Sequence, residues 1–308
     1  IISKKIIPTM NFFQGPNLTF ILCFLIGLIL KKLKLLHKED AHILLRFVLN
    51  VCIPPLMILA IYRATLALDL LLVAFCAMLV MVIIYFISSA IGKKLKMEPQ
   101  TFGSFLVATM IMNTAFALPY FKVIGSEELA RASLFDIGNT IMIFTFAYYQ
   151  AIKYGSSANK EKIQLKKFLT LPPLYAIIFA VLIKISPIQL SNPVISFLEL
   201  LGNPTGILMM VALGLTCEPK LKHLGKALIA VILRMGAGLI IGYLLTIVFR
   251  LHGTAQIVVI VCSSLPAGFN TLILADRENM DRDFAATVVS ISTFIALFTI
   301  PLLINFFY

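Results

Sequence analysis

Apolar runs long enough to cross a membrane follow one another along almost the whole chain, separated by short polar or basic stretches. A transmembrane helix needs about 20 apolar residues, because each residue advances the helix by about 1.5 Å. Runs of this kind, bounded by charge or by proline and glycine, predict ten spans. Their limits are 17–36, 43–62, 66–92, 100–124, 129–152, 168–186, 193–217, 226–250, 254–276 and 283–307.

Two of these predicted spans contain a polar interruption with a proline. The fourth holds Asn113, Thr114 and Pro119, and the ninth holds Pro266 and Asn270. Proline lacks the N–H group that a helix needs, so Pro119 and Pro266 are expected to break or kink their helices. Freed backbone groups are tolerated in hydrocarbon only where they are buried in protein or line a wet cavity. Interrupted spans in both halves of a chain are typical of a transporter's substrate site.

Composition supports an all-α integral membrane protein surrounded by lipid. The 308 residues are 60% apolar and 13% charged, and the mean hydropathy is +0.99. Soluble domains are about 45–50% apolar and about 25% charged. The net charge of +12 comes from short basic clusters between apolar runs rather than from a polar domain, which excludes a nucleic-acid partner.

The basic residues predict the orientation. With the N-terminus outside, the inner loops carry 18 Lys and Arg residues and the outer side carries 7. Basic loops remain in the cytoplasm, so both termini are expected outside a bacterial inner membrane. The remaining basic residue, Arg234, falls within the eighth span, and its side chain is expected to extend to the cytoplasmic interface.

The longest inner loop divides the predicted spans into two halves of five. An odd number of spans forces the second half to enter from the opposite side, which predicts an inverted repeat. Pro54 and Pro204 lie 150 positions apart, and Pro119 and Pro266 lie 147 apart, which favours this repeat. The predicted organisation is an N-terminal extension (1–16), a first repeat (17–152), a cytoplasmic linker (153–167) and a second repeat (168–308).

The interrupted spans supply candidate substrate-binding residues. The N-terminus of a half-helix carries unpaired N–H groups and a partial positive charge, which suits an anion. Amide side chains both donate and accept hydrogen bonds, so Asn113 and Asn270 could contact a carboxylate. The alternative is that they only cap freed backbone. The candidates for substrate contact are Asn113, Thr114, Asn139, Ser264 and Asn270.

Asp136 in the fifth span is a candidate coupling group. Asn139 and Thr140 follow it by three and four residues, so the three side chains share one helical face. A carboxylate inside a span costs solvation energy and is functional by default, here as a carrier of a proton or another cation. The alternative is a hydrated position near the outer end, where Glu128 and Arg131 lie.

Other chemistry finds no support in the sequence. The 5 cysteines and 4 histidines form no disulfide framework, metal-ligand set or catalytic dyad. The nucleophile motif G-x-S-x-G and glycine-rich phosphate loops are absent. We therefore expect neither an enzyme nor an ATP-driven pump, no metal, and no cofactor apart from a coupling proton.

Two motifs resemble the auxin efflux carrier family, which includes plant auxin exporters and bacterial malate or malonate permeases. They are Asn113-Thr-Ala-Phe-Ala-Leu-Pro119 and the segment from Leu265 to Ala275, followed by Asp283 to Pro301. The resemblance extends from Asn17 to Tyr308. It implies a ten-helix 5+5 inverted repeat, with helices four and nine broken and crossing at mid-membrane. It also implies a homodimer that moves small organic anions by an elevator mechanism, with Asn113 and Asn270 contacting the substrate.

The match to relatives of this architecture is incomplete. The plant exporters carry a second asparagine and a proline on either side of the break in span four, and here only Asn113 has that form. The sodium ligands of bile-acid symporters have no counterpart in span nine. The sequence therefore favours proton coupling or uniport over sodium coupling. A secondary carrier of small carboxylates is the first hypothesis, and a facilitative or channel-like pore is the second.

Overall fold

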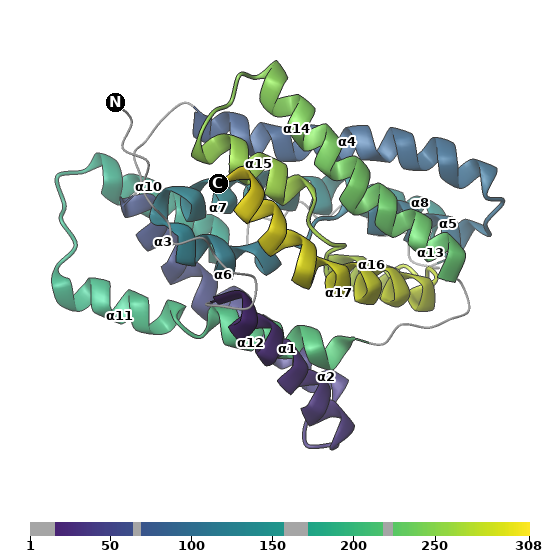
Figure 1. The fold of residues 1–308 in the computed structure, drawn as a ribbon, viewed down its shortest axis with the longest axis horizontal. Helices are drawn as coiled ribbons and strands as arrows, with labels where there is room; N and C mark the ends of the chain where they lie inside the picture. Colours follow the sequence, from purple (N-terminus) through teal and green to yellow (C-terminus); the bar gives the residue numbers. More distant parts are fainter. Residues whose placement is uncertain (1–15, 64–68, 157–171, 218–223) are drawn as a thin grey trace.

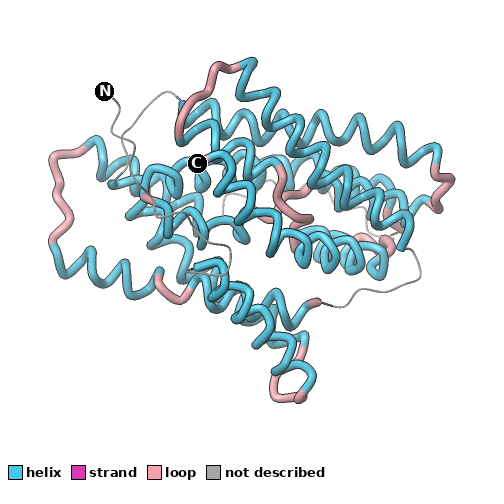
Figure 2. The backbone as a smooth tube through the Cα atoms, viewed as in Figure 1, coloured by secondary structure: helices cyan, strands magenta, loops and turns pink. Residues whose placement is uncertain are grey.

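Helices make up nearly all of the chain that the computed structural model describes, which is residues 16–63, 69–156, 172–217 and 224–308 (Figure 1). Short loops join them, and the described part contains no strand (Figure 2). The predicted extension 1–16, except its last residue, and most of the predicted linker 153–167 lie outside the described residues.

One group of helices, here called the panel bundle, combines the start of the chain with its middle. Helix α1 packs along α12, and α3 packs against α10 and α11. These helices occupy the left and lower part of Figure 1. The panel bundle consists of α1 (Pro16–Lys32), α2 (Lys38–Phe47), α3 (Ile53–Arg63), α10 (Pro172–Ile185), α11 (Asn192–Gly202) and α12 (Thr205–Thr216).

The remaining helices form a second group, here called the crossover bundle. Helix α4 packs against α7, and α14 packs against α15, with α17 crossing α5 and α13. The crossover bundle consists of α4 (Asp69–Lys94), α5 (Pro99–Met110), α6 (Thr114–Ile124), α7 (Ser126–Met142), α8 (Tyr148–Tyr154), α13 (Leu224–Val231), α14 (Gly238–Val248), α15 (Thr254–Ser263), α16 (Asn270–Arg277) and α17 (Arg282–Phe307).

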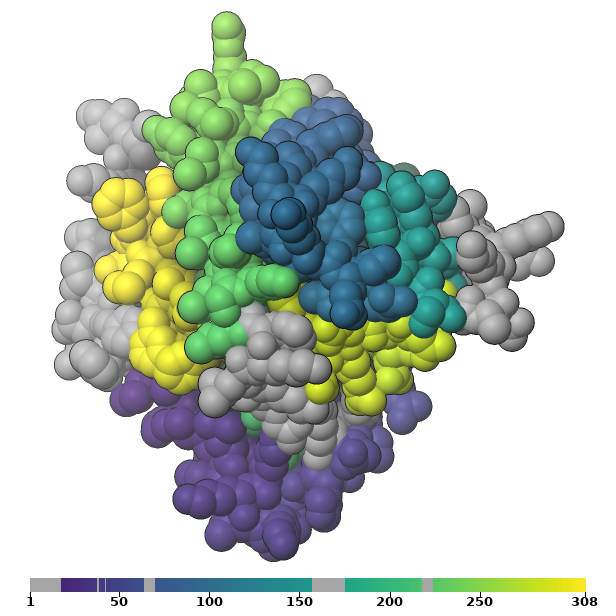
Figure 3. All heavy atoms as spheres, turned by 90° about the vertical axis from the view of Figure 1, so that its right-hand side faces the viewer, coloured from purple at the N-terminus to yellow at the C-terminus, as the bar shows by residue number. Residues whose placement is uncertain are grey.

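The two bundles meet along a limited set of helices. Helix α7 contacts α3, and α6 contacts α12. Seen from the right-hand side of Figure 1, the first helices of the chain project below the crossover bundle (Figure 3). Within each bundle the helices are in more extensive contact than across this boundary, so each bundle is a packing unit of its own.

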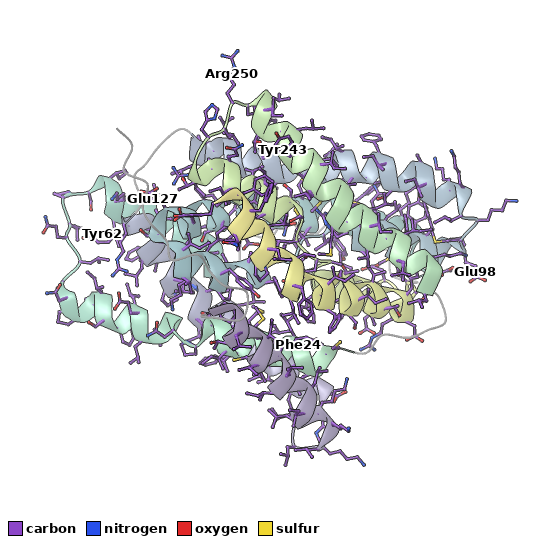
Figure 4. The ribbon with its side chains drawn as sticks, viewed as in Figure 1. Phe24, Tyr62, Glu98, Glu127, Tyr243 and Arg250 are labelled. Carbon is purple, nitrogen blue, oxygen red and sulfur yellow. The ribbon has the colours of Figure 1, made fainter. Side chains whose placement is uncertain are left out.

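The described helices confirm an all-helical membrane architecture. Five continuous helical stretches are long and apolar enough to span a bilayer, and three shorter apolar helices accompany them in the described part. Leu71, Phe86, Val248 and Phe306 are all at least 65% exposed, as expected for side chains that face lipid tails. Glu98 and Glu127 lie toward opposite ends of the long axis (Figure 4).

Three predicted spans contain a π-helical segment that the apolar pattern does not reveal. These segments are Val48–Cys52 between α2 and α3, Ile143–Ala147 between α7 and α8, and Ile232–Ala237 between α13 and α14. Each inserts an extra residue into the helical ladder and rotates the side chains that follow. Such bulges occur frequently at functional sites.

Backbone-to-backbone packing joins α1 to α12. A Cβ atom added at Gly27 would lie 2.2 Å from the carbonyl oxygen of Val211 and 3.0 Å from the Cα of Gly214. Small residues at such a contact allow two membrane helices to approach closely. The panel bundle therefore depends on glycine at both positions.

We expect Gly27→Ala to lower the free energy of unfolding by about 1–3 kcal/mol, because the added methyl group forces the two helices apart. Gly225→Ala on α13 is the matched control, since a Cβ atom there meets nothing within 4 Å. Alanine favours a helix over glycine by about 1 kcal/mol, so the control should be neutral or stabilised. Denaturant titration of the detergent-purified protein measures both, and equal effects would contradict the close contact.

Candidate functional site

Two helical segments are interrupted at the centre of the crossover bundle. Helix α5 ends at Met110 and α6 begins at Thr114, and between them Ile111 has an extended backbone (φ −79°, ψ 123°). Helix α15 ends at Ser263 and α16 begins at Asn270. Each interruption leaves the C-terminus of one half-helix and the N-terminus of another close together.

The two interruptions cross and hydrogen-bond to each other. The N–H of Asn113 donates to the carbonyl oxygen of Pro266 at 2.9 Å, and the N–H of Gly268 donates to that of Ile111 at 3.0 Å. Met112 and Ala267 form an antiparallel bridge between these bonds. The crossing segments thus satisfy backbone groups that would otherwise be unpaired inside the protein.

The expectation that Pro119 breaks its helix is wrong. Pro119 lies inside α6, five residues after the helix begins, whereas the chain leaves the helix at Ile111 to Asn113. The physical reason is that bonds to Pro266 and Gly268 replace the helical bonds at that point, while a proline inside α6 removes only one. Pro266 does lie in the second interruption, so the two prolines are not equivalent.

Side chains from neighbouring helices hold the crossing in place. The amide of Asn139 on α7 donates to the carbonyl oxygen of Met112 at 2.9 Å, and its oxygen accepts the N–H of Met112 at 3.4 Å. The N–H of Ala267 donates to the hydroxyl oxygen of Ser292 on α17 at 3.1 Å. Asn139 is therefore engaged with the backbone of the crossing.

A cavity of about 570 Å³ opens beside the crossing, between α2, α7, α16 and the two π-helical segments that follow α2 and α7. The structure brings together there Asn113, Thr114, Asp136, Asn139 and Asn270, which are five of the predicted site residues. Ser264 is not among the lining residues, because its hydroxyl donates to the carbonyl oxygen of Val261 and completes the end of α15.

Asn113 lines this cavity and carries a buried donor without a partner. Its side chain is 5% exposed, and its amide nitrogen has no hydrogen-bond partner. It lies at the N-terminus of α6, and Asn270 is the first residue of α16, so two half-helix N-termini border the same space. Buried donors normally have a partner. The arrangement offers a carboxylate an amide and two positive helix ends.

A carboxyl group borders the same space. The hydroxyl of Thr114 donates to Oδ1 of Asp136, and the amide of Asn139 lies 3.4 Å from that hydroxyl oxygen. Asp136 is half-buried and lines the cavity. A cavity that combines anion-binding helix ends with a carboxyl group can take an anion and a proton together.

Sequence reasoning missed three residues that the structure brings to the crossing or its cavity. Arg46 and Asn50 line the cavity from the end of α2 and the π-helical segment after it. Arg234 was expected at the cytoplasmic interface and is instead 0% exposed, bonded to the interrupted helices. That expectation is wrong because these backbone carbonyls, rather than interfacial water, solvate the guanidinium. The only sequence signal was a basic residue within an apolar run.

The profile of the membrane transport protein family matches residues 15–304, which is nearly the whole chain. The chain belongs to this family. Membership confirms the resemblance to auxin efflux carriers found in the sequence, and identifies this membrane transport protein as an integral membrane transporter rather than an enzyme.

Two archaeal relatives support the same conclusion. One, from Methanothermobacter thermautotrophicus, is 28% identical over 294 residues, which is 92% of this chain and 95% of the relative. The other, from Methanocaldococcus jannaschii, is 26% identical over 300 residues, which is 92% of this chain and 96% of the relative. Both are described as uncharacterized transporters.

Proposed function

We propose that this membrane transport protein is a secondary carrier of small carboxylates, which bind in the cavity beside the crossing. The observation that carries the proposal is the buried, unpartnered amide of Asn113 beside the N-termini of α6 and α16. These groups together favour an anion, and Arg46 adds a cationic side chain to the lining of the same cavity.

We infer a ten-span 5+5 inverted repeat, with the crossing at mid-membrane and both termini outside a bacterial inner membrane. Support comes from the agreement between the ten apolar runs and the helical stretches, and from the basic inner loops. Two interrupted helices whose half-helix ends point to one site are typical of inverted-repeat carriers. A homodimer is the oligomer that the family resemblance implies.

An elevator movement of the crossover bundle along the panel bundle would give alternating access. Asn113, Asp136 and Asn270 belong to the crossover bundle, whereas Asn50 and Met209 belong to the panel bundle. The cavity therefore lies on the boundary between two packing units. Displacing one unit relative to the other would carry the polar groups away from the panel and open the site on the opposite side.

Asp136 is the group we propose for proton coupling. An anion held beside its ionised carboxylate is repelled by about 4 kcal/mol if the charges are ~4 Å apart at an effective dielectric constant of ~20. Protonation removes this repulsion. Anion and proton would then bind together, and the hydroxyl of Thr114 would orient the carboxyl group.

A thermal-shift screen of mono- and dicarboxylates, at equal ionic strength and two pH values, tests the proposal. A ligand that binds only the folded state raises stability by RT ln(1 + [L]/Kd), about 2.7 kcal/mol at one hundred times Kd. At least one carboxylate should raise the melting temperature, and amines of similar size should not. The absence of any carboxylate-specific shift would contradict the proposal.

Counterflow distinguishes a carrier from a facilitative or channel-like pore. Proteoliposomes preloaded with an unlabelled carboxylate should take up the labelled one faster than empty proteoliposomes. The reason is that the binding site of a carrier returns to the outer face with unlabelled substrate bound and can then take up labelled substrate again. A pore shows no such trans-stimulation.

A further inference from the structure

Arg234 is a fully buried cation that the proposed transport mechanism does not use. Its side chain is 0% exposed and lies on the π-helical segment between α13 and α14. Within the described residues no carboxylate lies at ion-pair distance from its guanidinium. A charge in such a position is strongly disfavoured unless something else compensates it.

Backbone carbonyls from both interrupted helices provide the compensation. Nη1 donates to the carbonyl oxygens of Thr109 at 2.9 Å and Met110 at 3.1 Å, at the end of α5. Nη2 donates to the carbonyl oxygen of Ser263 at 2.5 Å, at the end of α15. The guanidinium therefore bridges the two C-termini that meet at the crossing.

The charges balance in sign and in size. Each helix C-terminus carries roughly −0.5 elementary charge, so the two together are equivalent to roughly −1, which one guanidinium neutralises. The two N-termini on the cavity side carry roughly +0.5 each. Asp136 is the carboxyl group that borders them, so a monovalent carboxylate in the cavity would complete the balance when Asp136 is protonated.

The space around the guanidinium is closed. A Cβ atom added at Gly238 would lie 2.7 Å from Nη2 of Arg234 and 2.1 Å from the carbonyl oxygen of Ser263. At Gly242, one turn further on, it would lie 2.6 Å from the Cβ of Ser263. Two glycines thus bring α14 against the end of α15. The guanidinium occupies the position where the carbonyl groups of Thr109, Met110 and Ser263 converge.

We propose that Arg234 is a tethered cation, which takes the place that a coupling metal ion would occupy at the crossing. Half-helix C-termini and unwound carbonyls coordinate the coupling cation in many carriers. Here those oxygens are already bonded to a side chain, so folding of the crossing and binding of the anion require no sodium. Arg234 is a positioning residue, because it acts through the half-helices. The consequence for transport rests on the proposed function, whereas the cation site itself does not.

The test measures the melting temperature of the unliganded protein in sodium chloride and in choline chloride at equal ionic strength. Choline is too large for a site built around a guanidinium. We expect the wild type to melt at the same temperature in both salts. A higher melting temperature of the wild type in sodium would overturn the proposal, because it would reveal an open metal site.

Arg234→Met removes the charge and keeps much of the side-chain length. We expect this variant to melt below the wild type in choline and to regain on the order of 2–5 °C in sodium or low-millimolar guanidinium, because a free cation fills the vacated site. A variant with the same melting temperature in all three salts would overturn the proposal.

Arg234→Lys retains a cation and replaces the methionine variant in the test if that variant does not fold. It should melt below the wild type, because an ammonium group lacks the planar fork that reaches both helix ends, and should be insensitive to sodium. Stabilisation of the lysine variant by sodium would overturn the proposal. None of these measurements needs a carboxylate. Failure of the carboxylate screen would therefore contradict the proposed function but not the proposal that Arg234 occupies a cation site.

Discussion

Replacing Asn113 by alanine is expected to weaken carboxylate binding roughly ten- to hundredfold. A hydrogen bond to a charged group is worth about 1.5–3 kcal/mol, and the substitution removes the buried, unpartnered amide donor of a residue that lines the cavity. The fold should tolerate the change, because only the backbone of Asn113 bonds to Pro266. Isothermal calorimetry with the carboxylate that gives the largest thermal shift measures the affinity, and the melting temperature of the unliganded protein should stay nearly constant.

Three further variants isolate the role of this amide. Asn113→Asp keeps the shape and adds a negative charge, so it should bind the anion more weakly than Asn113→Ala at neutral pH. Asn192→Ala, at an exposed position that begins α11, should change nothing. Asn139→Ala should instead lower the melting temperature, since its amide bonds to the backbone of Met112. If Asn113→Ala bound the carboxylate with wild-type affinity, Asn113 would not be part of the binding site.

Asp136→Asn is expected to abolish the pH dependence of transport. If the anion binds only when Asp136 is protonated, its apparent affinity in the wild type falls by up to about tenfold for each pH unit above the titration of that group. The asparagine variant mimics the neutral form and should bind with an affinity independent of pH. It should retain exchange of labelled for unlabelled carboxylate, but a proton gradient should no longer drive accumulation.

Uptake into proteoliposomes with an imposed pH gradient provides the measurement. Ser133→Ala on α7 is the control, because its hydroxyl donates to the carbonyl oxygen of Leu129 and the residue does not line the cavity. Accumulation driven by the gradient in Asp136→Asn would show that the proton is carried elsewhere. Uptake by the wild type that ignores the gradient would favour the facilitative alternative.

The helical architecture could be predicted because the bilayer imposes one length on every crossing segment. The predicted span 283–307 differs by one residue from the start of α17 (Arg282–Phe307) and matches its end. The π-helical segments could not be predicted, since one extra residue in a uniformly apolar run leaves hydropathy unchanged. Asn113, Asp136 and Asn270 could be predicted as site residues because each is a polar residue in an apolar run. A polar side chain in hydrocarbon costs solvation energy, so its presence there indicates a function.

What the sequence could not supply is the direction in which a polar side chain points. Asn113 and Asn139 are the same residue type near the same crossing, yet the amide nitrogen of Asn113 has no partner and that of Asn139 bonds to backbone. Arg234 is 125 positions from Thr109, so no local pattern could have indicated their contact. The break before Pro119 depends on a partner segment more than 150 residues away, which explains why proline rules misplaced it.

The pairing of α1 with α12 sets an order for biogenesis. Lys31 at the end of α1 donates to the carbonyl oxygen of Cys217, 186 positions later in the chain. A ribosome that has released the first helices must therefore make most of the protein before their partner emerges. Until then Gly27 has no neighbouring backbone to meet, and the nascent helices depend on lipid, the insertion machinery or a holding chaperone. Chains truncated before Thr216 should be prime substrates for membrane quality-control proteases.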